Sequence, residues 1–257
     1  MSTFKQLRVL FLLLILLTVA LGTWLTKLRT TSWEKPLVVA IYPINGDGSA
    51  QAAAYIEDLS LEDYADIEGF FADEAEHYGL TLRQPFELVM GPVLEAHPPE
   101  PPRDRNPLKV IWWSLQMRWW AWRVGRDHGP PANIQMFVLY HDPASSPTLS
   151  HSLGLQKGLL GVVHAFATHR QDAGNNVVIA HELLHTVGAS DKYDPRTNLP
   201  LFPIGYAEPD KRPLYPQEFA EIMAGRVPLS PTAFRQAEDL EEEVVGEVTA
   251  LEIRWIE

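Results

Sequence analysis

The chain has 257 residues, with 33 acidic and 21 basic side chains and no cysteine. This length suits one large domain with a sizeable hydrophobic core, and the lack of cysteine means that no disulfide stabilises it. The net charge of −12 argues against a nucleic-acid partner, because nucleic acids are bound by basic patches.

An almost uninterrupted apolar run extends from Leu7 to Leu25. At the rise of a helix, these nineteen residues approach the roughly 30 Å thickness of the hydrocarbon core of a bilayer. We therefore predict an uncleaved signal anchor, a single transmembrane helix within residues 1–30, with the folded domain of residues 31–257 on the periplasmic or extracellular side. A cleaved signal peptide that ends near Ala20-Leu21-Gly22 is the alternative interpretation.

Apolar periodicity over the rest of the chain predicts an α/β fold with a mixed sheet. Strands are expected over residues 37–44, 86–94, 133–140 and 161–168. Helical spacing predicts helices over residues 61–78 and 231–248, and a further helix from about residue 175. Residues 96–107 are dense in proline and charge, which indicates a surface loop.

The segment from Trp112 to Trp122 contains five tryptophans in eleven residues, with arginine among them. On a helix, one face would carry Trp112, Leu115, Trp119 and Trp122. We expect a core helix that backs the sheet, with tryptophan filling a wide gap. The alternative is an interfacial helix that rests the domain on a membrane, because tryptophan and arginine favour that boundary.

The most informative stretch runs from His181 and Glu182 to His185, and it continues to Gly188 and Asp191. Histidines four residues apart lie on one face of a helix, so both imidazoles can reach one metal ion. Gly188 permits a positive φ that turns the chain back, which allows Asp191 to supply a third ligand. Three protein ligands leave the fourth position of zinc open, as is typical of catalytic sites. Glu182 lies next to the first ligand, where it can act as a general base.

This motif resembles that of the metzincin clan of zinc endopeptidases, in which HExxHxxGxx(H/D) is followed by a methionine in a tight turn. Aspartate as the third ligand, and the run from Asp191 to Asp194, look like the snapalysin and immune-inhibitor-A type of these proteases. The resemblance covers residues 175–225, and the rest of the chain only by the order of its elements.

The resemblance implies that Met223, in the run Glu221-Ile222-Met223-Ala224-Gly225, forms the turn beneath the metal. Related families carry a tyrosine just after that methionine, whereas Ala224 follows here. A phenol that stabilises the oxyanion would therefore be Tyr193. The alternative is that Tyr193 packs against the site and never touches substrate.

Together, the residues and the resemblance lead us to expect a membrane-anchored, zinc-dependent endopeptidase. His181, His185 and Asp191 would hold Zn²⁺, and Glu182 would move a proton from the attacking water to the leaving amine. A protein or peptide substrate and a membrane are the expected partners, without nucleic acid. Two alternatives stay open: a zinc hydrolase of a non-peptide envelope amide, and a metal-binding interaction domain without turnover.

Other polar residues carry weaker signals. The spacing of His141, His151, His164 and His169 is nonspecific, so we expect solvated or hydrogen-bonded side chains and not a second metal site. For Asp194, a calcium ligand and a cap of its loop are both open. Residues 200–216 lie where specificity loops occur in similar proteases, and we expect them to form the wall of the S1′ subsite.

Overall fold

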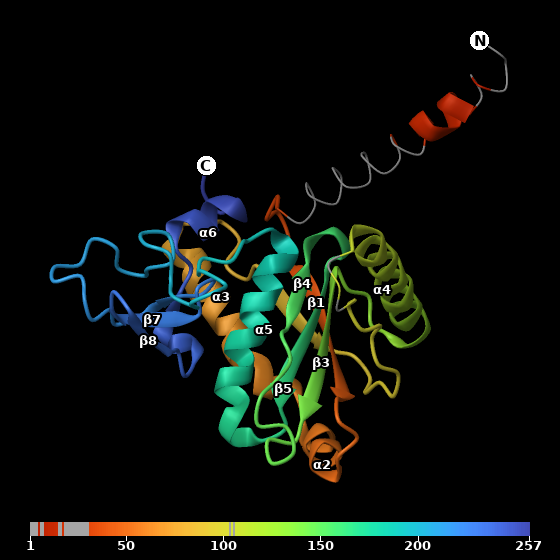
Figure 1. Cartoon of the computed structure of the whole chain (residues 1–257), viewed down its shortest axis with the longest axis horizontal. Helices are drawn as coiled ribbons and strands as arrows, with labels where there is room; N and C mark the ends of the chain where they lie inside the picture. Colours follow the sequence, from red (N-terminus) through yellow and green to blue (C-terminus); the bar gives the residue numbers. More distant parts are fainter. Residues whose placement is uncertain (1–4, 6–7, 15–16, 18–30, 103, 105) are drawn as a thin grey trace.

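The computed structural model describes residues 5, 8–14, 17, 31–102, 104 and 106–257. Its centre is a five-stranded sheet in the order β2-β1-β3-β5-β4 (Figure 1). Four strands are parallel: β1 (Leu37–Asn45), β2 (Phe86–Met90), β3 (Ile134–His141) and β5 (Leu160–Phe166). The edge strand β4 (Leu153–Leu155) is antiparallel to β5. The prediction of an α/β fold with a mixed sheet is thus confirmed.

Helices cover both faces of this sheet (Figure 1). One face packs against α2 (Ala50–Asp58), α3 (Ala65–His77) and α5 (Asp172–Val187). The other face packs against α4 (Pro107–His128) alone among the described helices. Successive side chains of a strand point to opposite faces, so Val39 and Ile41 join the first core and Ala40 and Tyr42 the second.

Most elements that were predicted for the five-stranded sheet and its helices lie at the expected positions. The expected strands over 37–44, 133–140 and 161–168 are β1, β3 and β5, and the helix over 61–78 is the short 3-10 helix η1 (Leu61–Tyr64) followed by α3. The strand expected over 86–94 ends at Met90, and Leu94 only forms an isolated bridge with Ile44. Two elements, α2 and β4, had not been expected.

The C-terminal part forms a second, small sheet in the order β8-β7-β6-β9. Its strands are β6 (Ala220–Glu221), β7 (Arg226–Ser230), β8 (Ala233–Gln236) and β9 (Glu243–Val244), and the helix α6 (Glu247–Glu252) follows. The helix expected over residues 231–248 is therefore wrong. Pairing of β8 with β7 and of β9 with β6 overrides the helix propensity of the glutamates in this segment.

The predicted membrane anchor is also wrong. Within the part of the chain that the structure describes, no helix is both long and apolar enough to cross a membrane. The single-pass topology, and the extracytoplasmic location inferred from it, lose their support. Residues 15–16 and 18–30, which include the alternative cleavage site, lie outside the described residues.

Candidate metal centre

The helix α5 carries the two histidines of the motif, both of them half-buried. His181 and His185 stand one turn apart, with ring centroids 4.8 Å apart. The helix ends at Gly188, whose φ of 119° is the left-handed conformation that the sequence had required of it. The amide groups of Gly188 and Ala189 both donate to the carbonyl of Leu184, at 3.1 Å each, which closes the helix and turns the chain back.

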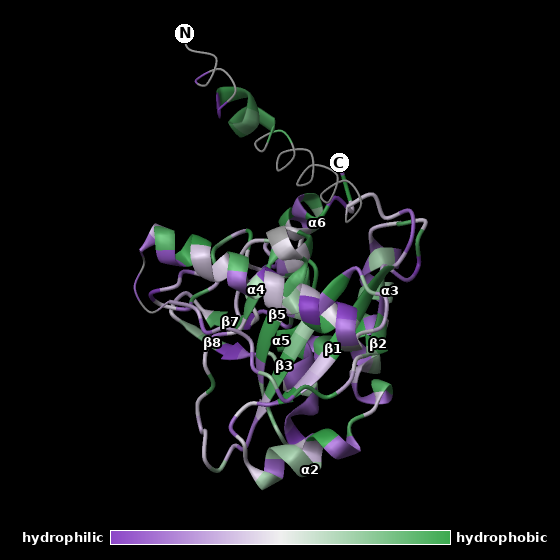
Figure 2. Cartoon of the chain, turned by 90° about the vertical axis from the view of Figure 1, so that its right-hand side faces the viewer, coloured by the Kyte–Doolittle hydropathy of each residue, from purple (hydrophilic) through white to green (hydrophobic). Residues whose placement is uncertain are grey.

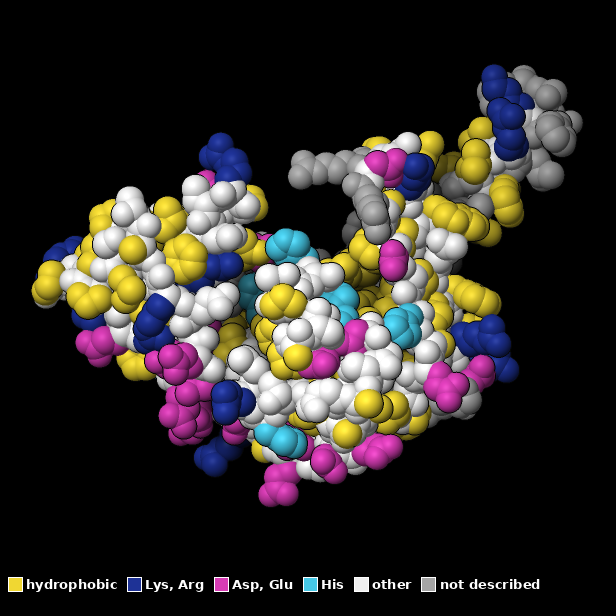
Figure 3. All heavy atoms as spheres, turned by 60° about the horizontal axis from the view of Figure 1, so that its bottom comes forward, with side chains coloured by type: hydrophobic (Ala, Val, Ile, Leu, Met, Phe, Trp, Pro, Cys, Tyr) yellow, Lys and Arg dark blue, Asp and Glu magenta, His cyan; other side chains and the backbone are white. Residues whose placement is uncertain are grey.

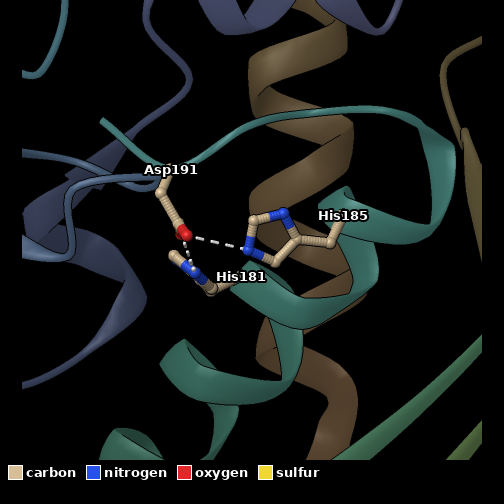
Figure 4. A group of neighbouring side chains, drawn as sticks. All are labelled: His181, His185 and Asp191. Carbon is tan, nitrogen blue, oxygen red and sulfur yellow. Dashed lines mark hydrogen bonds and ion pairs between the residues drawn. The ribbon is translucent and has the colours of Figure 1, made fainter. Parts of the chain in front are cut away.

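After this turn, Asp191 lies against both histidines (Figure 4). Its Oδ1 atom is 3.3 Å from Nε2 of His181 and 3.1 Å from Nε2 of His185. The structure therefore brings together all three residues that the sequence proposed as metal ligands, and their ligand atoms lie within 4.8 Å of one another. Although burial opposes the effect, hydrogen bonds from His181 and His185 in their protonated form hold the pKa of Asp191 well below its usual range.

The other ring nitrogens of these histidines are fixed by backbone carbonyls. Nδ1 of His181 donates to Ile222 O at 2.8 Å, and Nδ1 of His185 donates to Ala189 O at 2.9 Å. A neutral imidazole has one N–H group, so each Nε2 presents a lone pair to the same carboxylate oxygen. The two Nε2 atoms and the Asp191 oxygen would then face one another with lone pairs, which repel unless a proton or a cation lies between them. The donor set fits Zn²⁺, and the carbonyls supply the usual orienting contacts of zinc-binding histidines.

Glu182 points into the same site from the neighbouring position on α5. The residue is only 6% exposed, and its Oε2 atom has no hydrogen-bond partner among the described residues. Burial raises the pKa of its carboxyl group, while His181 and His185 oppose that increase. A buried carboxylate oxygen without a partner is costly, which is typical of a group that acts on a ligand.

A cleft of about 1160 Å³ opens in front of His181 and Glu182. One wall is the segment 147–152, just before β4, and the opposite wall is the segment 235–239, at the end of β8 and beyond. Several histidine side chains lie near the middle of the face shown in Figure 3. None of positions 200–216, which were expected to form the wall of the S1′ subsite, is among the residues that line this cleft.

Met223 lies in a tight turn beneath the site. The amides of Ala224 and Gly225 both donate to the carbonyl of Glu221 at 2.8 Å, and Gly225 has a φ of 62°. Met223 itself is fully buried, and its carbonyl accepts the amide of Lys192 at 2.9 Å. The turn thus contacts the loop that carries Asp191, and it supplies the Ile222 carbonyl that orients His181.

Tyr193 lines the cleft, and its ring also packs under the guanidinium group of Arg226 at 4.6 Å. Burial, with the nearby charge of Asp191, raises the pKa of its phenol. Arg226 was not among the predicted site residues. Its contact with Tyr193 spans 33 positions of the chain, and nothing local in the sequence signals it.

Three of the four histidines with weaker signals have a hydrogen-bond partner. His141 Nε2 and His164 Nδ1 lie 2.9 Å apart, and His169 Nδ1 lies 2.9 Å from Asp172 Oδ2. His169 and Asp172 also lie near Asp63, but Asp172 already accepts from Tyr55 and Asp63 from Ser60. His151 lies in the cleft wall.

Asp194 caps its own loop. Its Oδ1 accepts the amide of Arg196 at 2.8 Å, and its Oδ2 lies 3.3 Å from the Arg196 guanidinium. Of the two roles left open for this residue, the structure shows the cap.

Comparison with known proteins adds no assignment: no family model matches the chain, and no curated protein matches its sequence.

Proposed function

We propose that this protein is a zinc-dependent endopeptidase. The observation that carries the proposal is the convergence of His181 Nε2, His185 Nε2 and Asp191 Oδ1, beside the unpartnered Oε2 of Glu182. Zinc hydrolases activate water with three metal ligands and a further carboxylate that does not bind the metal. The resemblance to the metzincin motif points to the same chemistry.

His181, His185 and Asp191 would hold Zn²⁺, which when bound would supply a Lewis acid for the attacking water and the scissile carbonyl. Glu182 accepts the proton of the attacking water at Oε2 and passes it to the nitrogen of the leaving amine. Its burial keeps the carboxylate out of bulk solvent and raises its basicity. Tyr193 lines the cleft, where its hydroxyl is the phenol that we propose for the oxyanion.

The position of β4 supports a peptide substrate. This strand is the last of the five-stranded sheet, so one of its edges is unpaired within that sheet. It packs against α5 so closely that Gly154 lies against Glu182 O, and the segment before it forms one wall of the cleft. An extended peptide can add to such an edge through backbone hydrogen bonds, which would lay a scissile bond beside Glu182.

Metal content and turnover of four forms of the protein test the proposal. We expect one zinc per chain in the wild type and in Glu182→Gln, and a strongly reduced content in Asp191→Ala. Glu182→Gln should lose about 10²–10⁴-fold in the rate of peptide hydrolysis, the usual effect of removing a general base. Glu57→Gln, at an exposed position of α2 outside the cleft, is the matched control and should keep both properties.

Absence of zinc from the folded wild type would refute the metal centre. Zinc without hydrolysis of any unfolded protein substrate would instead favour the other two functions, the hydrolase of a non-peptide amide and the domain without turnover. Hydrolysis of small amides by the same sample separates those two. Retained activity in Glu182→Gln would overturn the role of the base.

A further inference from the structure

The surface of α4 has two different faces. Trp113, Met117, Ala121 and Val124 are buried against the sheet, which confirms the expected core helix for that side. Trp113 also donates its indole N–H to Pro99 O at 2.8 Å. The opposite face carries three more tryptophans, each of which is more than half exposed.

The exposed face is a continuous apolar stripe along a helix of 22 residues. Trp112 is 64% exposed, Trp119 58% and Trp122 56%. The stripe consists of these three residues together with Leu108, Ile111 and Leu115. With a periodicity of 3.6 residues, the six side chains lie within about a third of the circumference of the helix. Figure 2 shows α4 lying across the outside of the sheet, on the side of the molecule that faces the viewer.

Basic residues border the stripe. α4 contains Lys109, Arg118, Arg123 and Arg126, and its one acidic residue is Asp127. The guanidinium group of Arg123 lies over the ring of Trp119, with its Cζ atom 5.7 Å from the ring centroid. In the same way, Cζ of Arg126 lies 5.3 Å from the ring centroid of Trp122. Lys109 pairs with Asp104, and Arg123 lies 3.8 Å from Asp127. Arg118 and Arg126 have no ion-pair partner among the described residues, so the helix keeps a positive charge in a chain whose net charge is −12.

We infer that α4 docks on the surface of an anionic lipid bilayer. Tryptophan and arginine side chains favour the boundary between headgroups and acyl chains, and the cation–π contacts hold both at the same depth. An amphipathic helix with an apolar face and a basic border binds in the plane of that boundary. The contact is peripheral and involves no membrane-spanning helix.

Charge distinguishes this occupant from a second copy of the chain. In a twofold contact the same patch meets itself, so the basic borders of two α4 helices would lie side by side. Such like-charge contacts are unfavourable in a desolvated interface. An anionic lipid surface complements the same charges, and each lysine or arginine near it strengthens binding by about fivefold.

A fluorescent label on α4 tests the inference directly. The chain has no cysteine, so Gln116→Cys, at the exposed border of the stripe, gives one labelling site in the full chain. We expect the emission of a polarity-sensitive label to shift to the blue on vesicles of equal parts phosphatidylcholine and phosphatidylserine. The shift should weaken on phosphatidylcholine alone. The same label on Glu57→Cys, an exposed position of α2, is the control and should not shift.

Two variants separate the stripe from binding through other segments. Trp119→Gln with Trp122→Gln should abolish the shift, and Arg123→Gln should weaken vesicle binding about fivefold. Val93→Gln, which removes another exposed apolar side chain, should change neither. All these side chains face solvent, so the fold should persist.

Three outcomes would overturn the inference: an unchanged emission of the label at position 116 on vesicles, an equal shift of both labels, and a shift that depends on protein concentration without vesicles. The last result would assign the stripe to a second copy of the chain.

Discussion

Lys192 Nζ lies 2.6 Å from Glu252 Oε2, and the lysine is only 1% exposed. The same ammonium group donates to the carbonyl of Ser190 at 2.8 Å and to its hydroxyl at 3.0 Å. Glu252 also accepts the amide of Ser190 at 2.9 Å. This buried ion pair therefore ties the loop of Asp191 to the C-terminal helix α6, and so it positions one of the three proposed ligands.

Removing the carboxylate of this ion pair should destabilise the fold more than removing its ammonium group. Glu252→Gln leaves a charged Lys192 buried without its partner, which costs about 3–5 kcal/mol in the free energy of unfolding. Lys192→Met leaves Glu252, whose side chain is 29% exposed, in contact with water, and we expect a loss of about 1–3 kcal/mol. Urea unfolding of both variants measures the difference, and equal losses would contradict it.

Gly154→Ala should disturb the proposed metal centre through its contacts with α5. A Cβ atom at this position would lie 2.3 Å from Glu182 O and 2.6 Å from His185 Cβ, so β4 or α5 must move. We expect a loss of about 1–3 kcal/mol in stability and weaker zinc binding. Gly69→Ala is the control, because an added Cβ meets nothing within 4 Å in α3, and it should raise stability by about 0.5–1 kcal/mol. Calorimetric titration with zinc, beside thermal unfolding, measures both properties. Unchanged zinc affinity in Gly154→Ala would show that the contact does not position His185.

Stability should fall in mild acid because of His164. Burial, aided by the neighbouring His141, lowers the pKa of its imidazole from 6.5 to about 4. The unfolded chain binds a proton below about pH 6.5 and the folded chain does not, so the free energy of unfolding decreases as the pH falls from 6.5 towards 4. The full effect is at most about 3 kcal/mol, and partial exposure of the ring reduces it.

The variant His164→Gln should flatten this dependence, whereas His151→Gln, an exposed histidine, should leave it unchanged. Urea midpoints at several pH values between 7.5 and 4 provide the comparison. A wild-type slope that survives in His164→Gln would assign the effect to another group.

Zinc should stabilise the fold by mass action. At a free concentration about 100 times its dissociation constant, a ligand that binds only the folded state adds about 2.7 kcal/mol to the free energy of unfolding. For a chain of this size we expect a rise of several degrees in the unfolding temperature. Asp191→Ala should lose most of the rise, and Asp194→Ala, whose carboxylate only caps the next loop, should keep it. A chelator should reverse the rise in the wild type. An equal response of the two variants to zinc would exclude Asp191 as a ligand.

The sequence predicted the parts of the site that depend on local geometry. The spacing of His181 and His185 and the turn at Gly188 follow from the dihedral angles of a helix and its end, so Asp191 could be placed beside the two histidines. The sheet was predicted for the same reason, since its parallel strands are continuous apolar runs.

The other elements depend on contacts between distant segments. The bond of His181 to Ile222 O joins residues 41 positions apart, and that of Lys192 to Glu252 joins residues 60 positions apart. The segment 231–248 has the composition of a helix, but β8 and β9 gain strand partners that only the folded chain provides. Both faces of α4 carry tryptophan, so the sequence alone does not say which face packs on the sheet. Tertiary packing leaves Trp112 exposed.

The hydrogen bond from His181 to the carbonyl of Ile222 has a consequence for biosynthesis. The histidine leaves the ribosome well before the turn that orients its ring, and the loop of Asp191 is anchored later still, by Glu252 near the C-terminus. A nascent or truncated chain that lacks these segments would carry the whole HExxH sequence without an ordered donor set. Under the proposed function, hydrolytic activity would therefore appear only after these later segments have been synthesised and have folded, so a half-made chain would be inactive.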